Sequence, residues 1–295
     1  MARMMARSTV GETRALMRRY GLRARKSLGQ HFLVDRRVLQ RVVSAAELSC
    51  EDTVIEVGPG LGILTRELAS HAGKVIAVET DRSLAAALGE MVTGTDKVTI
   101  VQADILETEP GLLLRSAGVE GALPDYKVVA NIPYHITSPI LRHFLEASPK
   151  PTVMVVMVQK EVGEAIVAEP GKMSVLAVSV QFYGKPAIIG RVPARSFHPK
   201  PKVDSVILRI RVHERPPVEV PEVSEFFSLV RAGFCAPRKQ LRNSLAQGLG
   251  VPSGEAAGIL ERAMIDSRRR AETLSLQEWA ILLDAAGSRE GLARV

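Results

Sequence analysis

Short apolar runs alternate with amphipathic stretches along most of the chain. Five runs rich in β-branched residues predict strands, at Thr53–Val57, Lys74–Glu79, Val98–Val101, Lys127–Ala130 and Val153–Val158. Between them, helical spacing predicts helices over Ile63–Ser70, Leu84–Met91 and Pro139–Glu146. Strands that are apolar throughout and separated by helices are typical of a parallel sheet covered on both faces. We therefore predict an α/β fold with a doubly wound, mostly parallel sheet.

The pattern changes in the second half of the chain. Two later apolar runs, Met173–Phe182 and Val203–Val212, predict further strands that are expected to be antiparallel. A proline-rich break follows at residues 215–221. Beyond it, helices are predicted over Glu222–Gly233, Arg238–Ala246, Ala256–Met264 and Leu276–Ala285. These boundaries predict an N-terminal arm at residues 1–25, an α/β domain at 26–215 and a small all-α domain at 221–295.

Charge is distributed unevenly along the chain. The 295 residues have a net charge of +7. Residues 1–50 contain 11 Lys and Arg against 3 Asp and Glu, whereas residues 51–184 contain 10 against 17. A basic arm beside an acidic middle favours a polyanionic partner held at the margins of the α/β domain. A solvated basic tail would give the same counts, so charge alone leaves both interpretations open.

Composition excludes several classes of protein. The longest apolar run, Val153–Val158, is far shorter than the ~20 residues that cross a bilayer, so neither a membrane anchor nor a membrane partner is expected. Only Cys50 and Cys235 are present, which excludes a disulfide scaffold. We expect both side chains to be buried and the protein to lie in a reducing compartment, the cytoplasm.

The basic N-terminal segment also resembles an organellar transit peptide. Capping spacing at Thr9 and a helix stop at Gly21 favour a short structured arm.

Residues at the predicted strand ends indicate a nucleoside site, because open α/β sheets bind ligands there. Gly58 and Gly60 follow the first strand and let the backbone turn closely around a ligand. Glu79 ends the second strand, where a carboxylate can accept hydrogen bonds from both ribose hydroxyls. Asp104 follows the third and can accept from an adenine amine. A dinucleotide site would have a third glycine where Ile63 stands, so S-adenosylmethionine is favoured over NAD. A plain turn beside a surface acid is the alternative.

The segment Asn131-Ile132-Pro133-Tyr134 follows the fourth strand. Adenine's exocyclic amine is a poor nucleophile, because its lone pair is delocalised into the ring. The Asn131 side-chain oxygen and the Ile132 main-chain carbonyl can accept N–H bonds from this amine and favour a pyramidal nitrogen. Pro133 fixes the local φ angle and Tyr134 can stack on the base. Positioning and electrostatics would then supply most of the catalysis, without a metal. A turn that ends a strand is the alternative for the tetrapeptide alone.

The motif set closely resembles the rRNA adenine N6,N6-dimethyltransferases, nearest to the bacterial branch that acts on small-subunit (16S) rRNA. The matching segments are Gly29–Leu33, Glu56–Gly62, Ala103–Leu106, Asn131–Ser138, Arg195–Ser205 and Phe234–Leu245. The resemblance implies a Rossmann-like S-adenosylmethionine-dependent methyltransferase domain followed by a helical rRNA-binding domain. It further implies dimethylation of two adjacent adenines near the 3′ end of that rRNA, within a pre-ribosomal 30S particle, by a monomer.

The resemblance also assigns individual residues. His31 and Leu33 would contact the methionine half of the cofactor, with Asn131 beside it; the commonest family residue at position 31 is Asn. Phe197 would face Tyr134 across an adenine flipped out of its stack. Core packing is the alternative for Phe197. The remaining histidines show no metal-ligand spacing, so no metal is expected.

Cationic residues at both ends of the chain are the expected phosphate contacts. They are Arg23, Arg25, Lys26, Arg238, Lys239 and Arg242. A solvated helix face is the alternative for the C-terminal three. Two rival functions compete with the implied one: a large-subunit rRNA adenine methyltransferase that confers macrolide resistance, and a non-catalytic rRNA-binding assembly factor. The C-terminal helical match disfavours the first rival, and the intact Asn131–Tyr134 segment disfavours the second as a sole function.

Overall fold

A computed structural model describes residues 9–25, 29–119, 121 and 125–287. The described chain divides into two compact units. The first comprises the residues up to 163 together with 187–212, and the second comprises 164–186 together with those from 213 onward. Residues 164–186, which the sequence pattern places in the α/β domain, are therefore part of the second unit. Lys26 lies outside the described residues.

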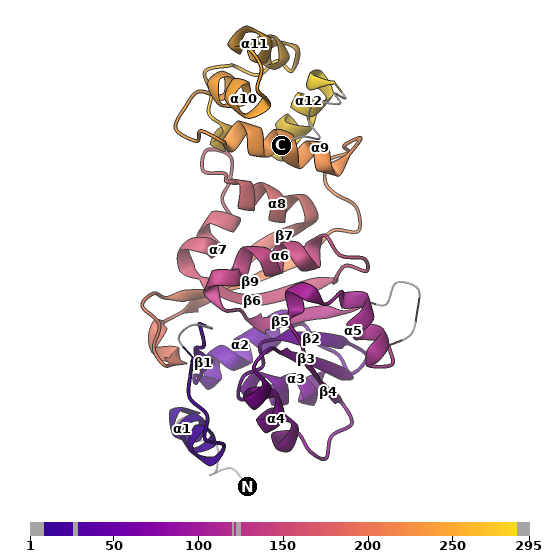
Figure 1. The fold of residues 1–295 in the computed structure, drawn as a ribbon, viewed down its shortest axis with the longest axis vertical. Coiled ribbons are helices and arrows are strands. Elements are labelled where there is room, and N and C mark those ends of the chain that lie inside the picture. Colours follow the sequence, from indigo (N-terminus) through magenta and orange to yellow (C-terminus); the bar gives the residue numbers. More distant parts are fainter. Residues whose placement is uncertain (1–8, 26–28, 120, 122–124, 288–295) are drawn as a thin grey trace. The chain divides into compact units, whose positions relative to one another are not determined.

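A seven-stranded sheet forms the centre of the first unit (Figure 1). Its strands are β2 (Thr53–Val57), β3 (Lys74–Glu79), β4 (Val98–Gln102), β5 (Lys127–Asn131), β6 (Val153–Gln159), β7 (Gly184–Val192) and β9 (Ser205–Val212). They are arranged in the order β4-β3-β2-β5-β6-β9-β7, in which β2 to β6 run parallel and β9 pairs antiparallel with β6. The predicted α/β fold, its five parallel strands and the late antiparallel strand near Val203–Val212 are confirmed.

A second, two-stranded sheet lies beside the first. In it, β1 (Phe32–Leu33) pairs antiparallel with β8 (Phe197–His198), and Phe32 is opposite His198. This pairing joins segments that are more than 160 residues apart in the sequence. It brings the segment that precedes the first predicted strand back to the edge of the α/β unit.

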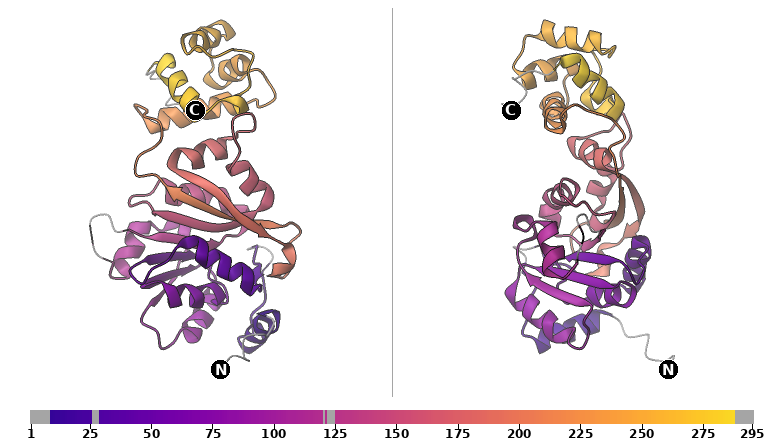
Figure 2. Two further views of the ribbon diagram at one scale, coloured as in Figure 1. Left: turned by 180° about the vertical axis from the view of Figure 1, so that it is seen from behind. Right: turned by 90° about the vertical axis from the view of Figure 1, so that its right-hand side faces the viewer.

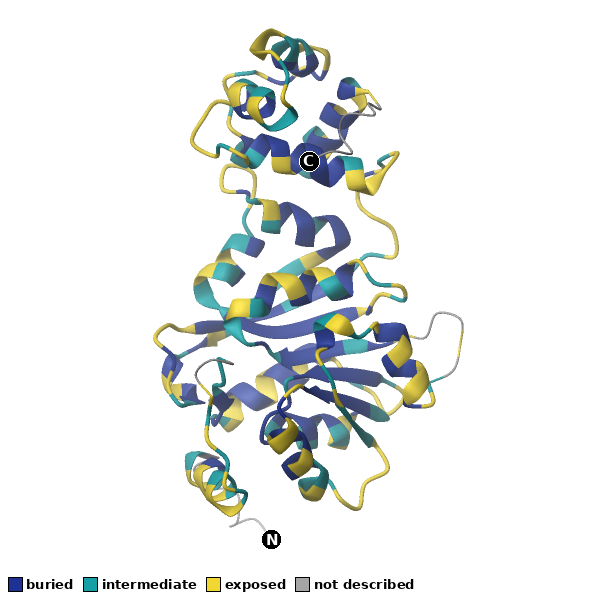
Figure 3. Ribbon diagram, in the orientation of Figure 1, coloured by how far each residue is buried: buried dark blue, intermediate teal, exposed yellow. Residues whose placement is uncertain are grey.

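Helices lie on both faces of the large sheet (Figure 2). They are α2 (Arg36–Ala46), α3 (Ile63–His71), α4 (Arg82–Met91), α5 (Pro110–Ser116), α6 (Thr137–Leu145) and α7 (Lys160–Ile166). Helix α1 (Thr9–Arg19) lies apart from the sheet (Figure 1) and packs against the cluster of Phe32, Leu61 and Leu84. The buried side chains of α2 and α3, such as Val42 and Leu68, form one core cluster with the strand residues Val54 and Val129. The strands β2, β3 and β6 are buried along nearly their whole length, whereas the edge strands β4 and β7 are mostly half-buried (Figure 3). Burial on both faces explains why the central strands read as continuous apolar runs.

The second unit is helical. Its helices are α8 (Val175–Tyr183), α9 (Val223–Phe234), α10 (Leu241–Leu249), α11 (Ser253–Arg262) and α12 (Leu276–Ala286). Short 3-10 turns complete the chain at η2 (Ile105–Glu107), η3 (Tyr134–Ile136), η4 (Ala194–Ser196) and η5 (Ala271–Thr273). Phe182 of α8 stacks on Phe226 of α9 with 5.0 Å between ring centroids. Trp279 is fully buried against Gly233, where any Cβ would lie 2.3 Å from the indole ring.

Two expectations from the sequence are wrong. Met173–Phe182 is not a strand, because Ser174 caps a helix by accepting a hydrogen bond from the Ala177 N–H at 3.1 Å. This helix is apolar on nearly every side, so its residues lack the periodicity that separates a helix from a buried strand. Cys50 and Cys235 are both exposed rather than buried. Among the helices in the described part of the chain, none is long and apolar enough to cross a membrane.

Candidate active site

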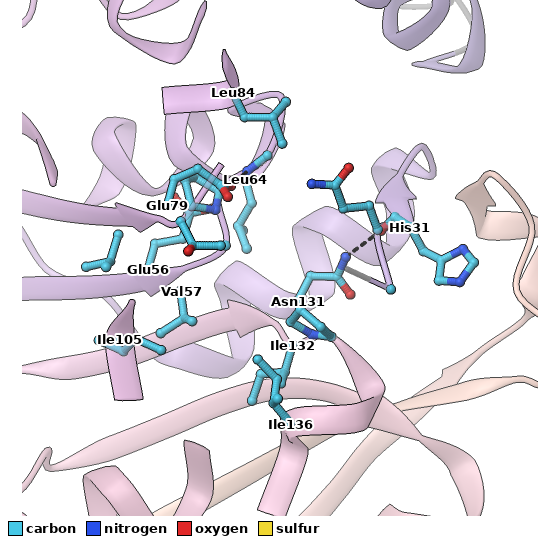
Figure 4. Close-up of a pocket in the computed structure, with 18 of the residues that line it drawn as sticks. His31, Glu56, Val57, Leu64, Glu79, Leu84, Ile105, Asn131, Ile132 and Ile136 are labelled. Atoms are coloured by element: carbon cyan, nitrogen blue, oxygen red, sulfur yellow. Dashed lines mark hydrogen bonds between the residues drawn. The ribbon is translucent and has the colours of Figure 1, made fainter. Parts of the chain in front are cut away.

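One cavity lies at the carboxyl ends of the parallel strands (Figure 4). It has a volume of about 260 Å³ and opens where β2, β3, β4 and β5 end. The segment that contains β1 forms a further wall. Ten of the predicted site residues line this cavity: His31, Leu33, Gly58, Gly60, Glu79, Asp104, Asn131, Ile132, Pro133 and Tyr134. Parallel strands of one sheet end at a common edge, which is why residues predicted one strand at a time converge here.

The glycine loop after β2 uses the conformational freedom of its glycines. Gly58, Gly60 and Gly62 all have positive φ angles, of +65°, +55° and +68°. At Gly60 a Cβ would also lie 2.9 Å from the Phe32 ring. One side of the loop therefore packs against the β1 segment, and its other side lines the cavity.

Glu79 supports this loop from the end of β3. Its Oε2 accepts a hydrogen bond from the Gly60 N–H at 3.1 Å, and its Oε1 accepts one from the Asp81 N–H at 2.9 Å. Burial raises the pKa of Glu79 above its usual value, although the two main-chain donors oppose that shift. The loop and the acid, which the sequence presents as separate signals, are thus one hydrogen-bonded unit. Each carboxylate oxygen keeps acceptor capacity for a ligand hydroxyl.

Asp104 stands at the end of β4, where it caps the η2 turn. Its Oδ1 accepts a hydrogen bond from the Leu106 N–H at 2.9 Å. The main chain before it is tied to the neighbouring strand, because the Ala103 N–H donates to the Glu79 carbonyl at 3.2 Å. These bonds hold the Asp104 carboxylate at the rim of the cavity with a second oxygen available to a ligand.

Glu56 is a buried acid in the cavity wall that was not predicted as a site residue from the sequence. It lies in β2, is 1% exposed and lines the cavity. Burial raises its pKa from 4.5 to about 8, and the nearby Glu79 carboxylate adds to the increase. The Thr65 hydroxyl opposes the shift, yet Glu56 Oε2 and Thr65 Oγ1 both lack a hydrogen-bond partner of good geometry within the described residues. A single acid inside the apolar run Thr53–Val57 was the signal that could have identified it.

Asn131 is oriented by the β1 segment. Its Nδ2 donates a hydrogen bond to the main-chain carbonyl of His31 at 2.7 Å (Figure 4). With its nitrogen engaged, the side-chain oxygen of Asn131 is free to accept a hydrogen bond from a ligand. Ile132 follows with 1% exposure. The β1 segment therefore contributes an orienting bond as well as a wall of the cavity.

Tyr134 begins the η3 turn and has two fixed contacts. Its hydroxyl shares a hydrogen bond of 2.6 Å with Ser205 Oγ, and its ring stacks on the His31 imidazole with 5.9 Å between centroids. The imidazole in turn donates from Nδ1 to the Pro199 carbonyl at 2.7 Å. Burial raises the pKa of Tyr134, which keeps the phenol neutral. Ser205 and Pro199 were not singled out by their sequence pattern.

Phe197 is not among the residues that line the cavity. It is 3% exposed, belongs to the core cluster with Val42 and Ile207, and pairs with Leu33 across the β1–β8 sheet. Its burial in this cluster is what the core-packing alternative expects. A role opposite Tyr134 would require the ring to leave this core.

The predicted phosphate contacts fall into different settings. Arg23 is exposed, whereas Arg25 pairs with Asp81 at 3.3 Å. In the second unit, Arg238 and Lys239 are exposed in the turn before α10, and Lys239 donates to Gln247. Arg242 is half-buried in α10, and its Nε has no partner among the described residues. Among those same residues, no three His, Cys, Asp or Glu side chains are grouped closely enough to hold a metal ion.

The chain is similar to known proteins of one family. The family model described as ribosomal RNA adenine dimethylase matches residues 21–282. A protein of Dehalococcoides mccartyi called ribosomal RNA small subunit methyltransferase A is 48% identical over 93% of this chain and 92% of its own length. A protein of the same description from Moorella thermoacetica is 46% identical over 92% of this chain and 96% of its own.

Two solved structures are also similar. The 23S rRNA methyltransferase ErmE has a TM-score of 0.68 and 30% identity, covering 87% of this chain and all of that one. A dimethyladenosine transferase from Plasmodium falciparum has a TM-score of 0.72 and 26% identity, covering 85% of this chain and 96% of that one. In both cases the similarity covers at least 85% of this chain, so it is not confined to one of its two units.

Proposed function

Because the chain belongs to the ribosomal RNA adenine dimethylase family, we propose that it dimethylates the N6 amines of two adjacent adenines near the 3′ end of small-subunit rRNA. The observation that carries this proposal is the orientation of Asn131, whose amide nitrogen is held by the His31 carbonyl. That bond turns an acceptor oxygen toward the cavity, where an adenine amine would need one. The curated relatives at 46–48% identity are named for the small subunit, which favours this rRNA over the large-subunit rRNA.

The cavity suits S-adenosylmethionine. When bound, this cofactor supplies a methyl group on a sulfonium, which is already activated for transfer. Glu79 and Asp104 offer acceptors for the ribose hydroxyls and the adenine amine, at the ends of adjacent strands. The glycine loop leaves room for close approach. Glu56 has an oxygen without a hydrogen-bond partner among the described residues, and a cationic ligand beside it would favour its ionised form. Leu33 and His31 close the methionine side of the cavity in this proposal.

Methyl transfer then depends on how the chain holds the target amine. The Asn131 oxygen and the Ile132 main-chain carbonyl accept its N–H bonds and direct the nitrogen lone pair toward the methyl group. Tyr134 provides the stacking face in this proposal, and Ser205 anchors its hydroxyl. The stacking of the His31 imidazole on Tyr134 supports an aromatic-stacking role for that ring. The base itself must be flipped out of its stack to reach this position.

Basic residues of both units are proposed to bind the rRNA backbone. Arg23 and Arg25 belong to the N-terminal arm, and Lys26 directly follows it. Arg238, Lys239 and Arg242 belong to the helical unit. The proposed substrate is rRNA within a pre-ribosomal 30S particle in the cytoplasm, met by a monomer. The helical unit is proposed to act as the rRNA-binding domain of the chain.

Mass spectrometry of rRNA from a strain that lacks this gene tests the proposal. Dimethyladenosine should disappear from small-subunit rRNA and return when the wild-type gene is restored. Asn131→Ala should not restore it, whereas Gln40→Ala, which changes an exposed amide on α2, should. Loss of the modification from large-subunit rRNA instead would assign the chain to the macrolide-resistance reaction. Unchanged dimethyladenosine in both subunits would leave only a non-catalytic assembly role.

A further inference from the structure

The first unit has a second concavity, outside the candidate active site, whose lining is strongly basic. It lies between α1, the turn that follows α1, and β8. Arg14, Arg18, Arg23 and His198 contribute its polar groups. The three arginines are exposed, and none forms an ion pair with any residue in the described part of the chain. Three unneutralised guanidinium groups around one hollow favour a polyanionic ligand.

Helix α1, which carries Arg14 and Arg18, is docked rather than free. Met17 and Leu22 pack against the cluster that contains Phe32. Glu12, on another side of the helix, pairs with Arg36 of α2 at 3.5 Å and with Arg66 of α3 at 3.3 Å. An isolated 11-residue helix would be marginal in water, so these contacts are what hold it. They also leave Arg14 and Arg18 directed to the hollow.

The basic concavity and the candidate active site share a wall. His198 lines the concavity, and its partner across the β1–β8 sheet is Phe32, which lines the active-site cavity. The next residue, Pro199, accepts the hydrogen bond from His31, whose ring lies on Tyr134. The basic concavity therefore lies beside the segments that form one wall of the candidate active site.

We propose that Arg14, Arg18, Arg23 and His198 bind the phosphodiester backbone of the substrate RNA next to the flipped adenine. This inference rests on the proposed function and specifies where the strand runs. An extruded base leaves its phosphates outside the pocket, so the backbone must pass beside the cavity mouth. Phosphate contacts at that point fix the register of the strand without reading its sequence. The docked α1 helix is thus a positioning element for the target nucleotide.

The test compares the salt dependence of rRNA binding in the full-length protein and in a triple variant, Arg14→Gln, Arg18→Gln and Arg23→Gln. A phosphate contact on single-stranded RNA contributes about 0.7 to the slope of log affinity against log salt, so the triple variant should lower that slope by about 2. At 0.15 M salt this corresponds to an affinity about 50-fold weaker. Cofactor affinity, measured by calorimetry, should not change.

Two matched variants separate charge from fold. Replacing the same three arginines with lysine keeps the charge and should keep most of the slope. Arg115→Gln removes an exposed charge from α5, which lies away from α1 (Figure 1), and should leave binding unchanged. An equal loss in the lysine and glutamine triple variants would show that α1 matters only as structure and would overturn the inference.

Methyl transfer measured in parallel distinguishes this inference from the proposed function. If the glutamine variant binds with the wild-type slope and methylates rRNA with the wild-type KM, the concavity is not a phosphate site and the proposed function stands. If its slope falls as expected but the wild-type protein makes no dimethyladenosine, the phosphate site stands and the proposed function fails. The supporting outcome is a raised KM for rRNA together with the reduced slope.

Discussion

Glu56→Gln is the most informative single substitution, because it removes one buried acid and keeps its shape. Burial raises the pKa of this carboxyl from 4.5 to about 8, and the group is 1% exposed. At about 1.4 kcal/mol per pKa unit, the difference corresponds to roughly 5 kcal/mol of free energy between the two protonation states. The neutral carboxyl is therefore the stable form in the folded protein near pH 7.

The sign of the pH dependence follows from proton binding. Between pH 4.5 and about pH 8 the folded state holds a proton on Glu56 that the unfolded state has already released. The stabilisation that protonated Glu56 gives the folded state is therefore complete below pH 4.5 and is lost as the pH rises toward 8. The expected slope is about 1.4 kcal/mol per pH unit. Glutamine does not titrate, so Glu56→Gln should gain stability relative to the wild type as the pH rises.

Cofactor binding should be coupled to the same proton. The proposed cofactor carries positive charge, which favours the ionised form of Glu56 and should expel up to one proton at pH 7. Calorimetry in two buffers of different ionisation enthalpy measures that proton directly. Because Glu79 is present in both proteins, the difference between wild type and Glu56→Gln isolates Glu56.

Urea unfolding at pH 5, 6, 7 and 8 and the two-buffer calorimetry together check this reasoning. Parallel pH profiles of unfolding in wild type and Glu56→Gln would show that burial does not hold the proton on Glu56. Equal proton release by both proteins would show that this carboxyl does not face the cofactor's charge. Either result would refute the electrostatic interpretation of the cavity wall.

Three further changes test other parts of the site. Asn131→Ala should slow single-turnover methyl transfer by about 10²–10³-fold while cofactor affinity changes little, because its oxygen acts mainly on the transition state; a near-normal rate would overturn the mechanism. Gly60→Ala should weaken cofactor binding more than Gly58→Ala, since both have positive φ angles but only a Cβ at Gly60 would meet the Phe32 ring; calorimetry giving equal losses would contradict this. Phe197→Ala should destabilise the protein by about 3–5 kcal/mol in thermal or urea unfolding, as expected for a buried ring. Accumulation of monomethyladenosine by the folded variant would instead indicate that Phe197 reaches the base.

The elements of the α/β unit could be predicted because their signals are local. A buried parallel strand is a short apolar run, and the runs at Thr53–Val57 and Val153–Val158 correspond closely to β2 and β6. The helix at Arg36–Ala46 was missed, although Asp35 caps it and its buried valines have helical spacing. The segment Val175–Tyr183 was assigned to the wrong class, because a helix buried on nearly all sides loses the polar face that marks it.

By itself, the sequence determined which residues stand at the strand ends, and hence that Gly58, Glu79, Asp104 and Asn131 meet at one edge of a sheet. Only the tertiary structure decided what each of them contacts. The Asn131–His31 bond spans 100 residues, and the placement of Phe197 in the core follows from its pairing with a strand more than 160 residues away. The spacing of residues along the chain predicts backbone geometry over a few residues. The orientation of a side chain depends instead on its packing against segments that are distant in the sequence.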